Sequence, residues 1–178
     1  MAGRKYVSDY RLEKVITPSG KVETRQIYQG VYYRYEKSRE EILRLRRNVL
    51  LGTVLSALLI IPLFITSAML SHIMYVVLPA AFSLIPMYLL LAGARRLGFG
   101  EEKFTREHRD KTEKRIARAS LWLTILLGAT VAGCVVYTCL FPVILEEYLC
   151  MASLLLSVGA SVWLLPQRKK AKAVEIEK

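Results

Sequence analysis

The sequence predicts an all-α membrane protein in which four transmembrane helices form two helical hairpins, with a small cytoplasmic β-hairpin near the N-terminus. Three observations lead to this prediction. The chain of 178 residues is 53% hydrophobic and 23% charged, yet its mean hydropathy is positive, at +0.31. Its charges are confined to a few segments. The long uncharged stretches between them have the lengths that bilayer-crossing helices need.

The charged residues are strongly segregated along the chain. Of the 26 Lys and Arg residues, 12 lie in residues 1–47, 9 in residues 95–118 and 5 in residues 167–178. The 15 acidic residues follow the same segments, except for the adjacent pair Glu146 and Glu147. A soluble domain would mix its charges throughout, and a nucleic-acid-binding domain would spread a basic stripe over its surface. The pattern excludes both classes, as well as a disordered chain, and indicates a multi-span membrane protein.

The first uncharged stretch, residues 48–94, is too long for one crossing. As a continuous helix it would extend about 70 Å, roughly twice the thickness of the hydrocarbon core. It must therefore reverse once, and the polar residues Ser71 and His72 mark the reversal. We expect spans at about residues 48–70 and 73–94.

The second half of the chain predicts two more spans, at about residues 119–141 and 146–166. Pro142 and the carboxylates of Glu146 and Glu147 separate them, because proline interrupts a helix and carboxylates are unfavourable in lipid. None of the four spans has the solvated polar stripe that a helical bundle in water requires.

The positions of the basic residues predict the orientation. Four crossings place the N-terminal region, the middle loop and the tail on one face, and the excess of Lys and Arg makes that face cytoplasmic. We expect a multi-pass protein of the cell membrane with both termini in the cytoplasm and an uncleaved first span. The chain divides into a cytoplasmic β-hairpin appendage (1–37), a basic helix with a transmembrane hairpin (38–94), a cytoplasmic basic loop (95–118), a second transmembrane hairpin (119–167) and a basic tail (168–178).

The N-terminal region is predicted to contain a β-hairpin. Residues 10–17 and 21–28 are rich in β-formers and flank Pro18-Ser19-Gly20, which suits a type I turn. A lone hairpin is marginal in water, so it needs a third strand, a partner or the bilayer surface. Residues 31–35 are the predicted third strand, returning after a turn at Gln29-Gly30.

A tyrosine cluster in this region has two interpretations. In the first, the tyrosines form an aromatic face that docks a partner chain or lies among lipid headgroups. In the second, they reflect only β-propensity and the enrichment of aromatic residues next to a membrane. Both interpretations stay open from the sequence. The cluster consists of Tyr28, Tyr32, Tyr33 and Tyr35.

Two basic helices are expected to lead into spans one and three. Ser38 and Glu41 form a capping-box pattern at the start of the first. Residues 101–118 lack Pro and Gly and are predicted to form one solvated helix. Its stabilising i,i+4 pairs would be Glu102 with Arg106, Glu107 with Lys111 and Asp110 with Lys114.

Small residues on spans three and four predict close helix packing. Such stripes let helix backbones approach and let hydroxyl groups bond across the interface. We expect these two spans to pack on each other, or on a second copy of the protein, through these faces. The residues concerned are Gly128, Ala132, Gly133, Ser153, Ser157 and Ser161.

Prolines interrupt spans one and two. A proline frees a backbone carbonyl and kinks a helix, which creates a hinge or lines a polar path, although packing also tolerates prolines in spanning helices. The three candidates are Pro62, Pro79 and Pro86.

No catalytic, cofactor or metal site is expected. His72 and His108 are predicted on opposite faces of the membrane. Cys134, Cys139 and Cys150 have no CxxC spacing. Cys139 and Cys150 are predicted at similar depth near the outer surface, and either a disulfide or two free thiols fits that placement. The spans carry no Asp, Glu, Lys, Arg or His at membrane depth, which argues against an ion-coupled transporter.

The sequence favours a non-enzymatic accessory or scaffold subunit that presents a basic cytoplasmic face to a protein partner or to a second copy. The alternative is a small permease or channel component with a proline-kinked pathway. Nucleic acid is not expected as a partner, because acidic residues dilute the basic field. The expected contacts with anionic lipid headgroups are Arg44, Arg46, Arg47, Arg95, Arg96, Arg115, Arg118, Arg168, Lys169 and Lys170.

Overall fold

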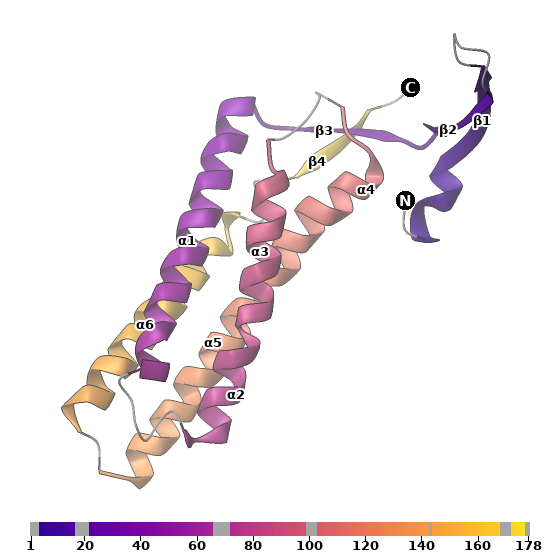
Figure 1. Ribbon diagram of the computed structural model, residues 1–178. Helices are drawn as coiled ribbons and strands as arrows, with labels where there is room; N and C mark the ends of the chain where they lie inside the picture. The colour runs from indigo at the N-terminus through magenta and orange to yellow at the C-terminus, as the bar shows by residue number, and fades with distance from the viewer. Residues whose placement is uncertain are drawn as a thin grey trace.

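The computed structural model describes residues 4–16, 22–65, 72–98, 103–142, 144–167 and 172–176. It contains four helices that are long and apolar enough to cross a membrane, which confirms the prediction of four apolar helices (Figure 1). They are α1 (Arg39–Ile65), the pair α2 (Met74–Phe82) and α3 (Leu84–Arg96), the series of α4 (Arg106–Arg109), a π-helical turn (Asp110–Lys114) and α5 (Arg115–Leu140), and α6 (Leu145–Leu164).

The start of α1 matches the predicted capping box. The Ser38 backbone N–H donates to Glu41 Oε2 at 3.3 Å, and the Glu41 N–H donates to Ser38 Oγ at 3.4 Å. The two bonds satisfy donors that the first helical turn leaves without partners. The predicted reversal at Ser71 lies in residues 66–71, outside the described residues, whereas His72 is described and exposed.

The second apolar helix is broken in the middle, at Ser83. Pro86 has no N–H to donate to the carbonyl of Phe82, so one helical bond is lost there. Ser83 bridges the break, because its N–H bonds to the carbonyls of Pro79 and Ala80 and its hydroxyl donates to the Ala80 carbonyl at 2.6 Å. These bonds satisfy the Ser83 N–H and hydroxyl and the carbonyls of Pro79 and Ala80, as an apolar surrounding requires.

The helices pack as a bundle in which α6 lies against α1 and α5, while α5 lies against α2 and α3. The serine face of α6 meets α1, where Ser157 Oγ donates to the Ser56 carbonyl at 3.1 Å. Gly52 of α1 lies against Leu164 of α6. We expected the serine face to pack on span three or on a second copy. The structure places it on span one, because the first and last helices are neighbours in the bundle.

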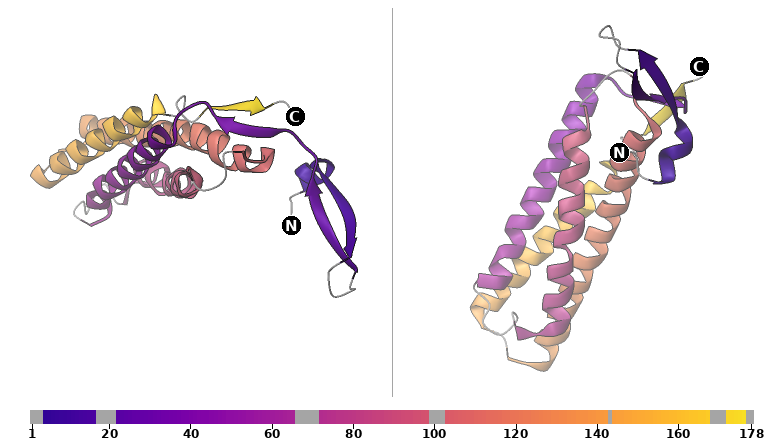
Figure 2. Two further views of the ribbon diagram at one scale, coloured as in Figure 1. Left: turned by 90° about the horizontal axis from the view of Figure 1, so that it is seen from above. Right: turned by 45° about the vertical axis from the view of Figure 1, so that its right-hand side comes forward.

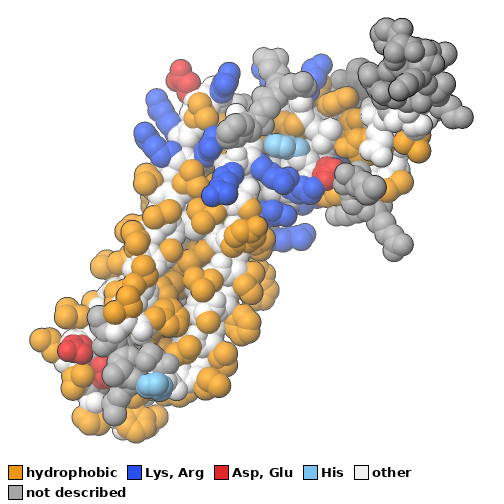
Figure 3. Space-filling view, in the orientation of Figure 1, with side chains coloured by type: hydrophobic (Ala, Val, Ile, Leu, Met, Phe, Trp, Pro, Cys, Tyr) orange, Lys and Arg blue, Asp and Glu red, His pale blue; other side chains and the backbone are white. Residues whose placement is uncertain are grey.

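The outer surface of the bundle is apolar over most of its length. Large side chains such as Leu58, Ile85, Trp122 and Leu149 are each more than half exposed, whereas leucines such as Leu127 fill the core. Hydrophobic side chains cover the shaft in Figure 3, and Lys and Arg gather at one end of it. A large exposed apolar surface of this kind is consistent with a membrane location.

The strands lie at one end of the bundle (Figure 1), the end at which Lys and Arg gather in Figure 3. A 3-10 helix (Arg4–Asp9) precedes β1 (Tyr10–Ile16), which pairs antiparallel with β2 (Val22–Tyr28), with Tyr10 opposite Tyr28. The hairpin prediction is confirmed for its strands. The predicted turn at Pro18 falls outside the described residues.

The prediction for the third strand is wrong in its partner. Residues Tyr32–Tyr35 form β3, but β3 pairs antiparallel with β4 (Ala173–Ile176) from the C-terminal segment and not with the hairpin. The hairpin therefore projects beside the bundle as two strands, and β3 and β4 lie across the bundle end (Figure 2). The tail, predicted only as a basic segment, contributes a strand to this end.

Candidate functional site

The three polar segments of the chain meet at one end of the bundle, in an assembly that we call the cap. It consists of β3, β4, Phe104 and residues 105–114. Phe104 pairs with β3 on the edge opposite β4: the Tyr33 N–H donates to the Phe104 carbonyl at 2.8 Å, and the Phe104 N–H donates back at 2.9 Å. The middle segment is thereby joined to the N-terminal segment.

The helix of the middle segment starts later than predicted. Thr105 is extended and caps α4 by accepting the His108 N–H at 3.5 Å, so Phe104 and Thr105 lie outside the helix. Residues 99–102 are outside the described residues, and with them the predicted pair of Glu102 and Arg106. The helix is also not a solvated one: Thr112 is fully buried, and the Asp110 side chain is only 8% exposed.

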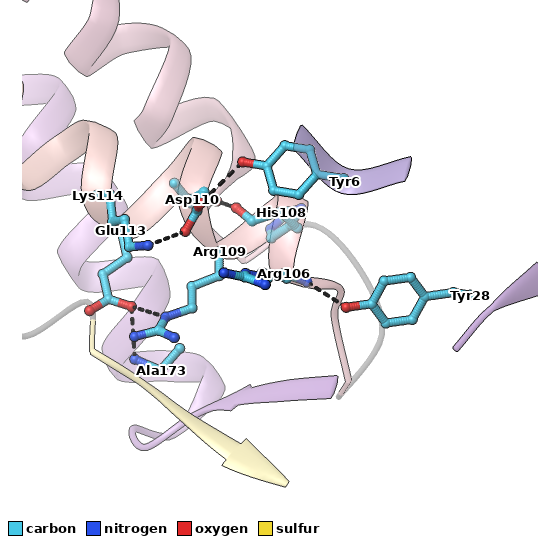
Figure 4. Close-up of polar contacts among 10 residues, drawn as sticks. Tyr6, Tyr28, Arg106, His108, Arg109, Asp110, Glu113, Lys114 and Ala173 are labelled. Atoms are coloured by element: carbon cyan, nitrogen blue, oxygen red, sulfur yellow. Dashed lines mark hydrogen bonds and ion pairs between the residues drawn. The ribbon is translucent and has the colours of Figure 1, made fainter. Parts of the chain in front are cut away.

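One carboxylate joins the middle segment to the tail (Figure 4). Glu113 accepts the Arg109 Nε–H at 3.1 Å and the backbone N–H of Ala173 at 3.3 Å, both at the same oxygen. The Arg109 guanidinium lies over the Tyr33 ring, 4.7 Å from its centre, in a cation–π contact. Hydrogen bonds of Glu113 thus join the helix to the tail, and the cation–π contact of Arg109 joins the helix to the N-terminal strand.

A row of aromatic rings lies behind this network. The Tyr35 and Phe104 ring centres are 4.6 Å apart, and those of Phe104 and His108 are 5.2 Å apart. Burial raises the pKa of Tyr35 to about 12. Burial, and after it the positive charge of Arg96, lowers the pKa of His108. Both side chains are therefore neutral near pH 7 and serve as packing elements of the cap.

The hairpin is attached to the cap through tyrosine hydroxyls. Tyr28 Oη accepts the N–H of Arg106 at 3.1 Å, a donor at the helix start that no intrahelical carbonyl can reach. Tyr6 Oη donates to Asp110 Oδ2 at 3.1 Å, and Lys114 Nζ forms an ion pair with Asp110 at 2.6 Å. Figure 4 shows the two tyrosines approaching the helix from the hairpin side.

The i,i+4 pairing of Asp110 with Lys114 agrees with the sequence prediction. Lys111 and Glu107 form the other predicted pair in the described residues. Such pairs depend only on helical spacing, so a sequence can indicate them.

The structure divides the predicted tyrosine cluster into two parts. Tyr33 is 7% exposed and Tyr35 is half-buried, so both stabilise the cap. Tyr28 and Tyr32 lie further out, with ring centres 5.1 Å apart in an edge-to-face contact, and Tyr10 stacks edge-on against Tyr28. The aromatic face available to a partner is therefore smaller than the sequence suggested.

The opposite end of the bundle has a polar contact that the sequence did not reveal. Glu147 is 1% exposed, while Glu146 is exposed. Glu147 accepts the Tyr137 hydroxyl at 3.3 Å and the backbone N–H of Ile144 at 3.3 Å. Its position caps the start of α6 and joins it to α5, which accounts for the buried carboxylate without a catalytic role.

The other predicted packing and pathway residues are spread over the bundle. Gly133 lies against the Tyr75 backbone, whereas nothing comes within 4 Å of a β-carbon at Gly128, and Ala132 is exposed. Ser161 is buried and Ser153 half-buried. Pro62 and Pro79 are half-buried, and Pro86 is buried beside a groove between α3 and α5.

The cysteines are free thiols. Cys134 and Cys150 are buried, and Cys139 is exposed. Among the described residues, no group of three His, Cys, Asp or Glu side chains is placed to hold a metal ion.

The basic side chains predicted to contact lipid are placed around the capped end. Arg44, Arg47, Arg95, Arg96 and Arg118 are exposed, and Arg46 and Arg115 are half-buried. Arg168, Lys169 and Lys170 lie outside the described residues.

Comparisons with protein-family models, with curated proteins and with solved structures find no match to this chain.

Proposed function

We propose that this chain is a non-enzymatic accessory or scaffold subunit of the cell membrane. Its four apolar helices cross the bilayer, its cap lies on the cytoplasmic side, and the β1–β2 hairpin is a docking arm for a protein partner. The observation that carries this proposal is a two-stranded hairpin held beside the bundle by a cap that ties three segments of the chain together (Figure 2).

The apolar side chains of the hairpin whose burial the structure describes are largely exposed. Leu12 is 64% exposed and Ile27 40%. A two-stranded sheet is at best marginally stable in water, and its unpaired edges are templates for further strands. The nearest strand, β3, cannot supply that pairing, because it already pairs with β4 on one edge and with Phe104 on the other.

The register indicates which backbone groups of the hairpin are available. The Gln29 N–H donates to the Asp9 carbonyl at 2.8 Å across the base of the hairpin. Bonded and non-bonded pairs alternate in an antiparallel ladder, so the opposed residues Leu12 and Gln26 form a non-bonded pair. Their N–H and C=O groups point to the outer edges, where an extended partner segment would add a strand.

Crosslinking in native membranes tests this proposal. A photo-reactive residue at the exposed Thr24 should give an adduct with a single partner protein, identified by mass spectrometry. Leu12→Pro or Gln26→Pro should abolish the adduct, because proline removes an outward N–H but is tolerated where no ladder bond is made. The matched variants Leu12→Ala and Gln26→Ala keep the N–H and should keep the adduct.

Three results would overturn the docking role. One is the absence of any adduct, and another is a chain that lacks residues 1–29 but keeps β3 and still co-purifies with the same partner. The third is an adduct of twice the chain mass, which would assign the hairpin to a second copy of the protein.

The orientation is tested separately. The basic residues at the capped end support a cytoplasmic cap through the positive-inside rule. In a cysteine-free background, His72→Cys should react with a membrane-impermeant maleimide on intact cells, and Lys103→Cys should not. Both positions are exposed in the structure. The reverse pattern would overturn the orientation.

A further inference from the structure

A groove of about 520 Å³ runs between α3 and α5, starting at the capped end. Its inner part is apolar and includes Ile85 and Pro86 on one wall and Trp122 and Leu126 on the other. Ile85 and Trp122 are each 57% exposed, so the groove opens on the outer surface of the bundle. It lies beside the helix break at Ser83.

The end of the groove near the cap is cationic. Lys114, Arg115 and Arg118 line it together with Asp110. The Asp110 carboxylate is already engaged, since it is paired with Lys114 at 2.6 Å and accepts the Tyr6 hydroxyl at 3.1 Å. The two arginines therefore give this end its net positive charge. Both belong to the first turn of α5, so they lie next to the apolar part of the groove.

The dimensions of the groove match one lipid chain in one leaflet. Lys114 and Leu126 both line it and are separated by about 18 Å along the helix, at 1.5 Å per residue. Half of the hydrocarbon core of a bilayer is about 15 Å thick. With the cationic end at the headgroup level, the apolar end reaches approximately the middle of the membrane.

We propose that this groove is a binding site for an anionic phospholipid of the leaflet next to the cap. The phosphate lies between Arg115 and Arg118, and one acyl chain lies along Ile85, Pro86 and Trp122. Guanidinium groups bind phosphate oxygens through paired hydrogen bonds, and basic pockets between spanning helices suit anionic headgroups. This site depends on membrane insertion of the helices and is independent of any protein partner of the hairpin.

The chemistry of the cationic end selects an anionic lipid over a zwitterionic one. A phosphatidylethanolamine headgroup needs an acceptor for its ammonium group beside the phosphate. The carboxylate available in the groove is that of Asp110, which already binds Lys114 and Tyr6. A phosphatidylglycerol headgroup needs no such acceptor and keeps its net negative charge, so the arginines bind it without competition from a second charge.

The chain supplies its own pair of reporters for this site. It contains two tryptophans, Trp122 in the groove and Trp163 on the exposed side of α6. Trp163 is 47% exposed and lies near the capped end of its helix, so it senses bulk lipid of the same leaflet. Trp163→Phe leaves the groove reporter, and Trp122→Phe leaves the bulk-lipid reporter.

The experiment measures fluorescence quenching of the full chain in phosphatidylcholine vesicles that contain a minor fraction of phosphatidylglycerol brominated on its acyl chains. Trp122 should be quenched well beyond the mole fraction of brominated lipid, and Trp163 only in proportion to it. Arg115→Gln with Arg118→Gln should lower the relative affinity about 30-fold, because each cation at the surface contributes about 1 kcal/mol and 1.4 kcal/mol is tenfold. Trp122 should then be quenched like Trp163.

The matched control is Arg44→Gln with Arg95→Gln, which removes two exposed cations of the capped end that do not line the groove. It should keep the excess quenching of Trp122. Equal quenching of both tryptophans in the unmodified groove would overturn the proposal. Excess quenching that is as strong with brominated phosphatidylethanolamine would overturn the specificity for an anionic lipid. Excess quenching that the control variant loses to the same extent would overturn the particular role of Arg115 and Arg118.

Discussion

Gly133 lies where α5 meets α2, and its replacement by leucine should force these two helices apart. A β-carbon at this position would be 3.0 Å from the Tyr75 carbonyl oxygen and 3.2 Å from Val76 Cγ2. Carbon atoms in good contact are about 3.5–4.0 Å apart. The first added atom is therefore already too close to a backbone atom, which cannot rotate away, and leucine adds three further carbons.

The expected loss of stability is considerable. Forcing additional carbons into a packed core costs about 1–3 kcal/mol. For a chain of this length, about 3 °C of melting temperature per kcal/mol gives a decrease in Tm of roughly 3–9 °C. The assay is thermal unfolding of the purified protein in detergent, followed by size-exclusion chromatography of the remaining folded fraction.

Gly128 provides the matched control on the same helix. Nothing comes within 4 Å of a β-carbon there, so Gly128→Leu should leave the Tm unchanged or slightly raised, since leucine is the better helix former. Equal melting of the Gly133→Leu and wild-type proteins would refute the close contact of α5 with Tyr75. A Gly128→Leu variant that melts lower and elutes as a smaller species would show that a second copy covers this face.

Two further predictions concern the cap. Glu113→Ala leaves the Ala173 N–H and the Arg109 guanidinium without their shared acceptor, at a cost of about 1–3 kcal/mol. Limited proteolysis should then remove the tail faster than in the wild type. Unchanged cleavage would contradict the role of Glu113. Burial and the charge of Arg96 lower the pKa of His108 in the folded protein, so the unfolded chain binds the proton first as the pH falls. The contribution of the ring to stability is therefore complete above about pH 6.5, and it is lost as the pH falls through the folded pKa. Between about pH 7.5 and about pH 5, the Tm of the wild type should therefore fall more steeply than that of His108→Gln, and parallel curves would exclude this histidine as the cause.

The features that the sequence predicts well depend on local spacing. Uncharged stretches give the four helices, and the three-residue spacing of Ser38 and Glu41 gives the helix cap. The same holds for the ion pair of Asp110 and Lys114. In each of these cases the interacting groups are neighbours on one helix, or the signal is hydropathy over a single segment.

Features that depend on distant segments are not visible in the sequence. Residues 31–35 have clear strand propensity, but propensity does not name the partner, and β4 lies about 140 residues further along the chain. Glu146 and Glu147 are chemically identical neighbours, and only the rotation of about 100° between adjacent helical residues turns one toward Tyr137 and the other outward. The groove likewise needs walls from two helices.

The pairing of β3 with β4 also sets an order of events during synthesis. β3 is made before any of the four apolar helices, and β4 after all of them. The strand pair therefore forms only once the last helix has been made and both ends of the bundle are in place, because its two halves are far apart in the sequence. A chain interrupted before residue 173 would contain every apolar helix, but one edge of β3 would lack its partner strand and Glu113 would keep only its bond to Arg109.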